Sequence, residues 1–205
     1  MTTDTTTNTT TGTTTNTATG TTTNTTAGTT TNTTAGTTTN TTAGTAGAGV
    51  AAAVAGRSRL DFGKTAGKAF RALIGFDAAA REGLDPALVE LIQIRASHLN
   101  HCAYCLHMHT SDARKAGESE ERLHMVAVWR EARHFFTEKE QAALALTEAV
   151  TLVADGGVPD EVYAEAAAGF DERELAQVLA LICTINTWNR VALATGKLAG
   201  TDERR

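Results

Sequence analysis

Three residues in one short stretch of the sequence have types and spacings suited to redox or acid–base chemistry. Cys102 and Cys105 form a C-x-x-C pair at the predicted start of a helix. Unsatisfied N–H groups and the helix dipole lower the pKa of a thiol there from its usual value of about 8.5. The three-residue offset also lets the two sulfurs form a disulfide. His109 lies one helical turn beyond Cys105 on the same face, where it can exchange a proton with a thiolate or a bound water molecule.

Glu90 adds a carboxylate from the preceding helix, where it lies within an apolar stripe. Its neighbours in the sequence are Leu88, Val89, Leu91 and Ile92. Two interpretations are open: an exposed residue at the edge of the stripe, or a buried group that takes up and releases protons.

A metal site is the main alternative for the cysteine pair. A tetrahedral Cys2His2 zinc site would use Cys102, Cys105, His109 and either His98 or His101. Three histidines are expected on the surface, namely His101, His107 and His124. The third cysteine and both tryptophans are expected to pack in the core, namely Cys183, Trp129 and Trp188.

The elements that position these residues are predicted to be helices, because apolar residues recur at helical spacing and no segment alternates with period two. Capping residues mark several starts: Asp85 before Pro86, Ser119, Thr137 with Glu140, and Asp171. The predicted helices are Lys64–Arg81, one from Pro86 through Leu99, Cys102–Gly117, one from Ser119 through Trp129, Ala142–Val153, Pro159–Gly169 and Leu175–Ala194. The fold class is therefore all-α.

The first 49 of the 205 residues differ from the rest in composition. Five tandem octapeptides run from Thr5 to Gly44, with units such as TTTNTTAG, and Asp4 is the only charge before residue 50. Such units bury almost no apolar surface, so we expect residues 1–49 to be a disordered tail. A single helical domain is predicted over residues 57–200.

Composition also excludes several classes of protein. With 18 basic and 23 acidic residues the net charge is −5, which argues against non-specific binding of nucleic acid. No run of 18 apolar residues is present, so no membrane span is expected. No secretory signal is visible, and three cysteines, an odd number, do not suit a disulfide framework. We expect a cytoplasmic protein.

The spacing Glu90-x11-Cys102-x-x-Cys105-x3-His109 resembles the AhpD-like alkylhydroperoxidases of the carboxymuconolactone decarboxylase superfamily. The similarity extends over residues 57–197, including RLDF at 59–62, ARKAG at 113–117 and INTWNRVALATG at 185–196. It implies an all-helical fold and a trimer or larger homo-oligomer, such as a hexamer.

The resemblance also implies peroxide reduction by Cys102 and Cys105, with Glu90 and His109 as a proton relay. Tyr104 stands where the founding peroxidases have a histidine, and we expect it, like His98, to be at most an auxiliary group. Tyrosine donates a hydrogen bond but is a poor base, with an unperturbed pKa of about 10. No metal or organic cofactor is needed, but an external dithiol of a lipoyl or thioredoxin-like protein must reduce the disulfide.

Two alternatives come from other classes: an acid–base enzyme of the carboxymuconolactone decarboxylase type, and a non-catalytic zinc-binding or redox-sensing module. For the peroxidase, two arguments assign the sulfurs differently. The helix terminus favours Cys102 as the attacking thiolate. The resemblance and the shorter distance to His109 favour Cys105, and we predict that Cys105 attacks and Cys102 resolves.

Overall fold

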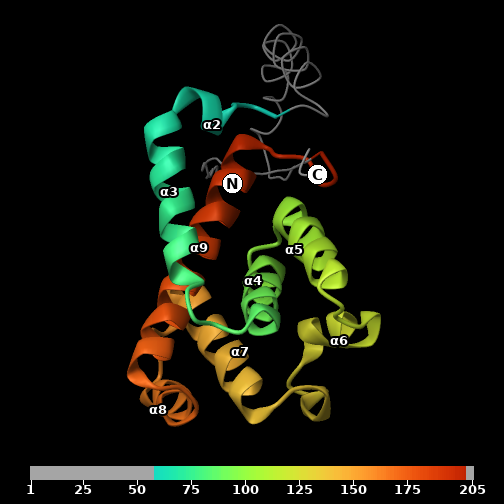
Figure 1. Cartoon of the computed structure of the whole chain (residues 1–205), viewed down its shortest axis with the longest axis vertical. Helices are drawn as coiled ribbons and strands as arrows, with labels where there is room; N and C mark the ends of the chain where they lie inside the picture. The colour runs from blue at the N-terminus through green and yellow to red at the C-terminus, as the bar shows by residue number, and fades with distance from the viewer. Residues whose placement is uncertain (1–57, 202–205) are drawn as a thin grey trace, which may run out of the picture. The chain divides into compact units, whose positions relative to one another are not determined.

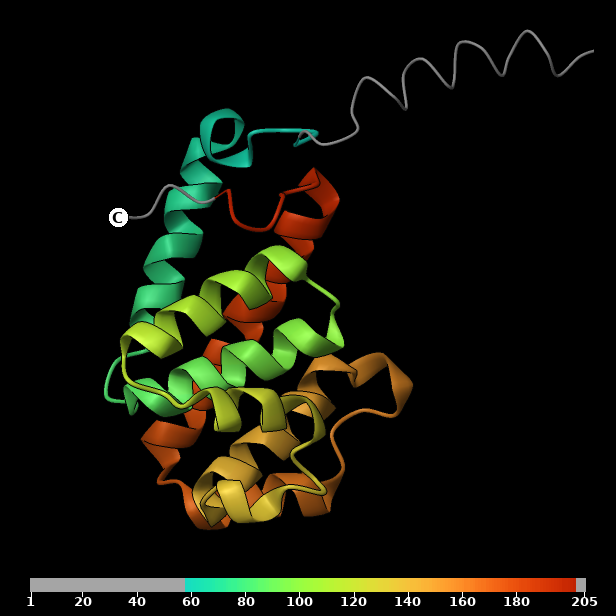
Figure 2. The same cartoon turned by 90° about the vertical axis from the view of Figure 1, so that its right-hand side faces the viewer.

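The computed structural model describes residues 58–201, which form helices joined by turns (Figures 1 and 2). No β-strand occurs in this part of the chain, which confirms the all-α prediction. The α-helices are α2 (Phe62–Thr65), α3 (Gly67–Ala80), α4 (Pro86–Leu99), α5 (Ala103–Lys115), α6 (Glu120–Met125), α7 (Glu138–Thr151), α8 (Asp160–Gly169) and α9 (Glu172–Thr195). Short 3-10 segments cover Val126–Val128, Arg133–Phe135 and Val153–Asp155. The repetitive segment 1–49 lies outside the described residues.

The predicted N-caps are confirmed. Each of four side chains accepts a hydrogen bond from a backbone N–H of the first turn that follows it: Asp85, Ser119, Thr137 and Asp171. Thr137 and Glu140 form the predicted capping box, with the hydrogen bonds made in both directions. Gly196 ends α9 in the left-handed conformation, with φ 68°, which glycine adopts without steric cost.

Two predicted helices are shorter than expected. The predicted helix Lys64–Arg81 is divided, because Ala66 has φ −116° and ψ 46° and so interrupts the helix between α2 and α3. The helix that begins after Ser119 ends at Met125 and tightens into a 3-10 turn before Trp129. Helix boundaries of this kind depend on packing more than on intrinsic propensity.

The prediction for Cys183 is wrong. Its side chain is exposed, because the buried face of α9 passes through Leu181, Ile182 and Ile185 and leaves Cys183 on the opposite side. Trp129 is buried in the core as predicted, whereas Trp188 is only partly buried.

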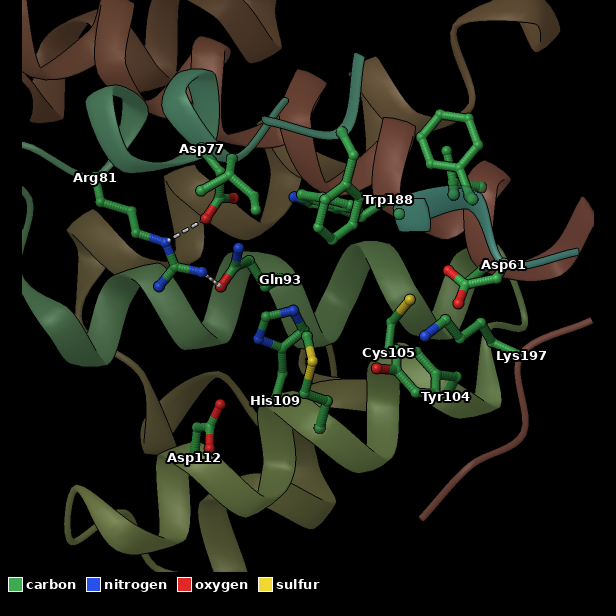
Figure 3. Close-up of a pocket in the computed structure, with 17 residues that line it drawn as sticks. Asp61, Asp77, Arg81, Gln93, Tyr104, Cys105, His109, Asp112, Trp188 and Lys197 are labelled. Carbon is green, nitrogen blue, oxygen red and sulfur yellow. Dashed lines mark hydrogen bonds and ion pairs between the residues drawn. The ribbon is translucent and has the colours of Figure 1, made fainter. Parts of the chain in front are cut away.

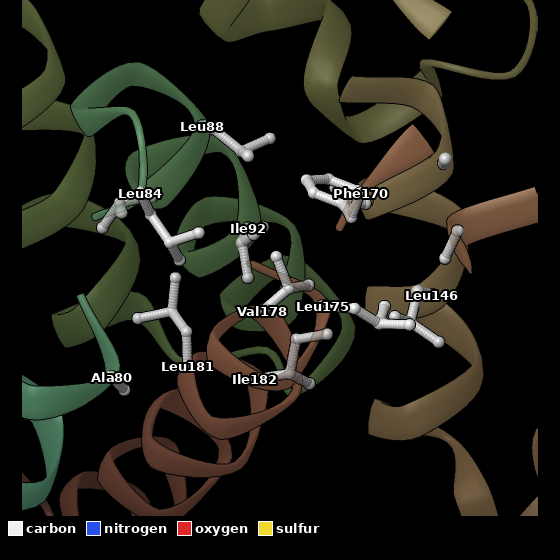
Figure 4. Packing of buried hydrophobic residues seen from close by; sticks show 14 residues of the cluster. Ala80, Leu84, Leu88, Ile92, Leu146, Phe170, Leu175, Val178, Leu181 and Ile182 are labelled. Carbon is white, nitrogen blue, oxygen red and sulfur yellow. The ribbon is translucent and has the colours of Figure 1, made fainter. Parts of the chain in front are cut away.

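Helix α9 is the central element of the packing and contacts α3, α4, α5, α7 and α8 (Figure 1). The largest apolar cluster lies where α4, α7 and α9 meet, and Figure 4 shows Ile92, Leu146, Val178 and Ile182 converging there. Among the described helices, α9 alone is long and apolar enough to cross a bilayer by length and composition, with a mean hydropathy of 1.2.

A tight connection between α4 and α5 brings the candidate residues together. Both helices lie side by side in Figure 2, joined through Asn100, His101 and Cys102. His101 adopts φ 54°, which is uncommon for a residue with a side chain. The chain therefore reverses within three residues, and α5 folds back along α4.

Candidate active site

The C-x-x-C pair lies at the N-terminus of α5. Cys102 is the N-cap residue, and its Sγ accepts a hydrogen bond from the backbone N–H of Cys105 at 3.4 Å. Both thiols are free and buried, and they form a small apolar cluster with Ala96, Ile185 and Ala192. The N–H groups of the first turn stabilise negative charge on a sulfur at this position, as predicted from the sequence.

The two thiols differ in how readily they ionise. The thiol of Cys105 donates a hydrogen bond to Cys102, and together with backbone N–H groups and Asn189 it lowers the pKa of Cys102 to about 7, although burial acts in the opposite direction. That same donated hydrogen bond, burial and the charge of Cys102 all raise the pKa of Cys105. The pair therefore loses one of its two protons first, and the two sulfurs share the proton that remains.

Glu90 and His109 form a direct pair. His109 Nδ1 lies 2.9 Å from Glu90 Oε2. The side chain of His109 is 3% exposed and that of Glu90 is 13% exposed, so Glu90 is largely buried and not an exposed residue at the edge of the stripe. His109 Nε2 is buried and has no hydrogen-bond partner among residues 58–201, which leaves that ring nitrogen available to a substrate.

Three polar residues that the sequence analysis did not identify complete the surroundings of Glu90. Arg81, just after α3, lies with Nη1 3.5 Å from Glu90 Oε1 and with Nε 2.9 Å from Asp77 Oδ2. Its Nη2 donates to Gln93 Oε1 at 2.9 Å (Figure 3). Gln93 interrupts the apolar run of α4 and is fully buried, and that polar residue on an apolar face was the available signal.

A cavity of about 500 Å³ opens beside these groups, and Cys105 and His109 both line it (Figure 3). Cys102 does not line it. Much of the wall is apolar and comes from α2, α3, α5 and α9: Phe62, Phe70, Ile74, Met108 and Trp188. Trp188 packs edge-on against Phe70, with ring centroids 5.5 Å apart. The sulfur of Cys105 thus lies where an apolar molecule can reach it.

Tyr104 and His98, the two auxiliary candidates, lie in different places. Tyr104 lines the main cavity, and Lys197 Nζ lies 5.2 Å from the centre of its ring. His98 lies in a separate cavity together with His107 and His124. Burial and the charge of Arg95 lower the pKa of His98. The structure therefore brings Tyr104, but not His98, to the cavity of Cys105. His101, His107 and His124 are exposed, as predicted.

The residues of the alternative zinc site do not converge. Within residues 58–201, no group of three or more histidine, cysteine, aspartate or glutamate side chains has a geometry that would hold a metal ion. His109 is oriented toward Glu90 instead, and His98 faces the other cavity. The arrangement suits thiol chemistry assisted by a carboxylate–imidazole pair.

Comparisons with known proteins identify a matching family and several similar proteins. Residues 65–149, which include Glu90, both cysteines of the pair and His109, match the carboxymuconolactone decarboxylase family. The uncharacterized protein YdfG of Bacillus subtilis (strain 168) is 44% identical over 112 residues, which are 55% of this chain and 76% of YdfG. The uncharacterized protein YnjA of Escherichia coli (strain K12) is 29% identical over 109 residues, covering 53% and 59% of the two chains.

Two solved structures are also similar. The first is a protein of unknown function from Agrobacterium tumefaciens, provisionally assigned as the antioxidant defence protein AhpD. It has a TM-score of 0.68 and 33% identity, over 71% of this chain and 100% of that one. The second is an uncharacterized peroxidase-related protein from Silicibacter sp. TM1040, with a TM-score of 0.56 and 20% identity, over 64% and 70% of the chains. This second similarity concerns the fold.

Proposed function

The chain belongs to the carboxymuconolactone decarboxylase family, in its AhpD-like part, and from this membership and the geometry of the cavity we propose that it is a thiol-dependent peroxidase. One observation carries the proposal: Cys105 opens onto a largely apolar cavity beside His109, and the second thiol, Cys102, is its hydrogen-bonding partner. An organic or hydrogen peroxide would enter the cavity and meet the sulfur next to a proton donor.

The first step would be attack by the Cys105 thiolate on one peroxide oxygen. Cys102 ionises first, and transfer of the shared proton from Cys105 to Cys102 moves the charge to the sulfur that the cavity exposes. The S–O bond forms as the O–O bond breaks, and Cys105 becomes a sulfenic acid. The departing alkoxide takes a proton from the Nε2 side of His109 in its doubly protonated form, and Glu90 supports that form through Nδ1.

The second step would form the disulfide. Cys102 loses its proton and attacks the sulfur of the sulfenic acid, and the S–O bond breaks. The proton that Cys102 loses ends on the departing hydroxide, which leaves as water. Cys102 and Cys105 are already adjacent on one helical turn, so this step requires little movement of the backbone.

An external dithiol would then reduce the disulfide by exchange, and a lipoyl or thioredoxin-like protein would supply it. A reducing compartment such as the cytoplasm fits this cycle. We also propose a trimer or hexamer, because apolar side chains of α3 and α9 are left exposed, among them Ile74, Phe76 and Leu193. Sedimentation that shows only monomer at micromolar concentration would oppose this assembly.

Stopped-flow mixing of the reduced protein with cumene hydroperoxide and with hydrogen peroxide tests the function. A Cys183→Ser background removes the exposed third thiol from the measurement. We expect peroxide to be consumed as a Cys102–Cys105 disulfide forms, which peptide mapping detects. A protein that consumes no peroxide and keeps both thiols would contradict the proposal.

The same protein, in the Cys183→Ser background, distinguishes the thiol peroxidase from the acid–base alternative. An enzyme of the decarboxylase type would use Glu90 and His109 and would not need the sulfurs. A variant with serine at both Cys102 and Cys105 would then keep its activity on a lactone substrate, whereas a thiol peroxidase loses all turnover.

A further inference from the structure

Asn189, on α9, is a fully buried polar side chain that the sequence analysis left without a role. It lies on the face of α9 that packs against the C-x-x-C pair, because Ile185 and Ala192, about one turn before and after it, belong to the same apolar cluster as Cys102 and Cys105. A buried carboxamide next to two apolar-packed sulfurs is costly unless its hydrogen bonds are satisfied. Its partners therefore show which way it faces.

Two neighbours on the α4 side fix the orientation of this carboxamide. Asn189 Nδ2 donates to Ser97 Oγ at 3.1 Å, and Asn189 Oδ1 accepts from Asn100 Nδ2 at 2.9 Å. A carboxamide nitrogen carries two N–H groups, so one remains for sulfur after Ser97 has taken the other. Asn100 occupies Oδ1 and Ser97 takes one N–H, so the second N–H of Nδ2 is the group that Asn189 can offer to a neighbouring sulfur.

Asn100 is itself held firmly. It is the C-cap residue of α4, and its Nδ2 lies 2.9 Å from each of three oxygens, Ala96 O, Asn186 Oδ1 and Asn189 Oδ1, which share its two N–H groups. His101 and Cys102 follow directly, so Asn100 connects the tight turn before the cysteines to α9. This network has little freedom to move when charge appears on a sulfur, which is the requirement for preorganised stabilisation.

We propose that Asn189 is a further catalytic residue of this site, whose Nδ2–H donates a hydrogen bond to whichever cysteine sulfur carries the negative charge. The inference rests on the proposed thiol chemistry and adds a fixed donor to it. The donor stabilises Cys102 in the resting monoanion and Cys105 once the shared proton has moved. It therefore stabilises both anionic forms, including the one in which Cys105, the sulfur that lines the cavity, carries the charge and can attack.

This role agrees with the ionisation of both thiols. The hydrogen bond from Asn189 lowers the pKa of Cys102 and opposes the rise in the pKa of Cys105. The effect on both sulfurs distinguishes Asn189 from the backbone N–H of Cys105, which donates to Cys102 Sγ. Removing Asn189 should consequently destabilise the thiolate without removing either nucleophile.

Alkylation by iodoacetamide across about pH 5 to 10 tests the proposal, with Cys183→Ser as background so that only the pair reacts. We expect Asn189→Ala to alkylate about tenfold more slowly near pH 6, because below the pKa of the pair a shift of about one pH unit in its titration lowers the thiolate fraction by that factor. The two proteins should alkylate at similar rates once the first ionisation of the pair is complete. Thiolate absorbance in the ultraviolet follows the same titration independently.

Gln141→Ala is the matched control. Gln141 is a buried carboxamide on α7 that donates to Arg133 O and Phe136 O and contacts neither sulfur. Its loss should leave the thiol titration unchanged. If Asn189→Ala loses its helical circular dichroism, Asn189→Leu, which keeps the size of the side chain but has no hydrogen-bond donor, replaces it in the comparison.

A folded Asn189 variant with an unaltered thiol titration would overturn the proposal. Alkylation requires no peroxide, so this result is separate from a failure of the peroxidase function. If the wild-type protein does not reduce peroxide but the Asn189 variant alkylates more slowly as expected, the peroxidase function is refuted. The role of Asn189 as a hydrogen-bond donor to the thiolate would still hold.

Discussion

The Nδ1 atom of His109 lies 2.9 Å from a carboxylate oxygen of Glu90, although the two residues belong to different helices. The pair is almost entirely buried, and His109 also lines the cavity that Cys105 shares. A carboxylate that holds one ring nitrogen orients the other toward a reacting group. This relationship supports the proton transfer in the proposed cycle.

Glu90→Gln is expected to lower peroxidase turnover by about 10²–10⁴, because glutamine keeps the size of the side chain but neither carries the negative charge nor relays a proton. Steady-state rates with the natural or an artificial dithiol measure the loss. Glu131→Gln, at an exposed glutamate, is the control and should retain full turnover. Unchanged turnover in Glu90→Gln would mean that Glu90 is only structural.

Arg81→Ala is expected to lower kcat by about tenfold, because Arg81 connects Glu90 to Asp77 and Gln93 and so holds the carboxylate in place. Separate determination of kcat and KM shows whether the loss lies in the chemical step. If KM alone changes, Arg81 contacts the substrate and does not position Glu90.

The rate of reaction with peroxide is expected to rise as the pH increases through about 7, because the lowered pKa of Cys102 sets the first ionisation of the dithiol. The thiolate is the reactive form, so the rate increases with pH as the monoanion of the pair forms. Initial rates from single-turnover mixing give the profile. A rate that rises only near the ordinary thiol pKa of about 8.5 would show that the pair does not lower its own pKa.

Glu148→Gln is expected to lower the free energy of unfolding by about 2 kcal/mol, because Arg95 and Trp129 lose a largely buried partner. Burial would raise the pKa of Glu148, but hydrogen bonds from Trp129 and Arg130 and the charge of Arg95 together lower it. The stabilisation is therefore present above the usual value of 4.5 and is lost as the pH falls through the lowered pKa.

Thermal melts of Glu148→Gln and wild type at several pH values measure this loss of stability and its dependence on pH. The difference in Tm should shrink in acid. Glu120→Gln, which removes an exposed ion pair with Arg114, should barely change Tm at any pH. A Glu148 variant as stable as wild type at neutral pH would contradict the expected role.

Local features of the sequence predicted the helices and the reactive group well. The N-caps Asp85, Thr137 and Asp171 act within their own first turns, so their partners can be read from adjacent residues. Cys102, Cys105 and His109 also belong to one helix and its cap, and their relative placement follows from helical spacing.

The rest of the site depends on packing between distant segments. Arg81 and Trp188 reach the cavity only because α3 packs on α9 and α9 packs on α4 and α5, and no local pattern encodes that arrangement. Asn189 similarly meets the cysteines across about ninety residues of sequence. Cys183 was misassigned because one position along a helix decides whether a residue faces the core.

Trapping of sulfenic acid by dimedone in two single variants tests the central claim most directly, again with Cys183→Ser as background. After one equivalent of peroxide, Cys102→Ser should form one adduct per chain at Cys105 and should not turn over, whereas Cys105→Ser should form almost none. Adducts confined to Cys102 would reverse the assignment of the two sulfurs. Peroxide consumption with no adduct in either variant would contradict the thiol mechanism itself.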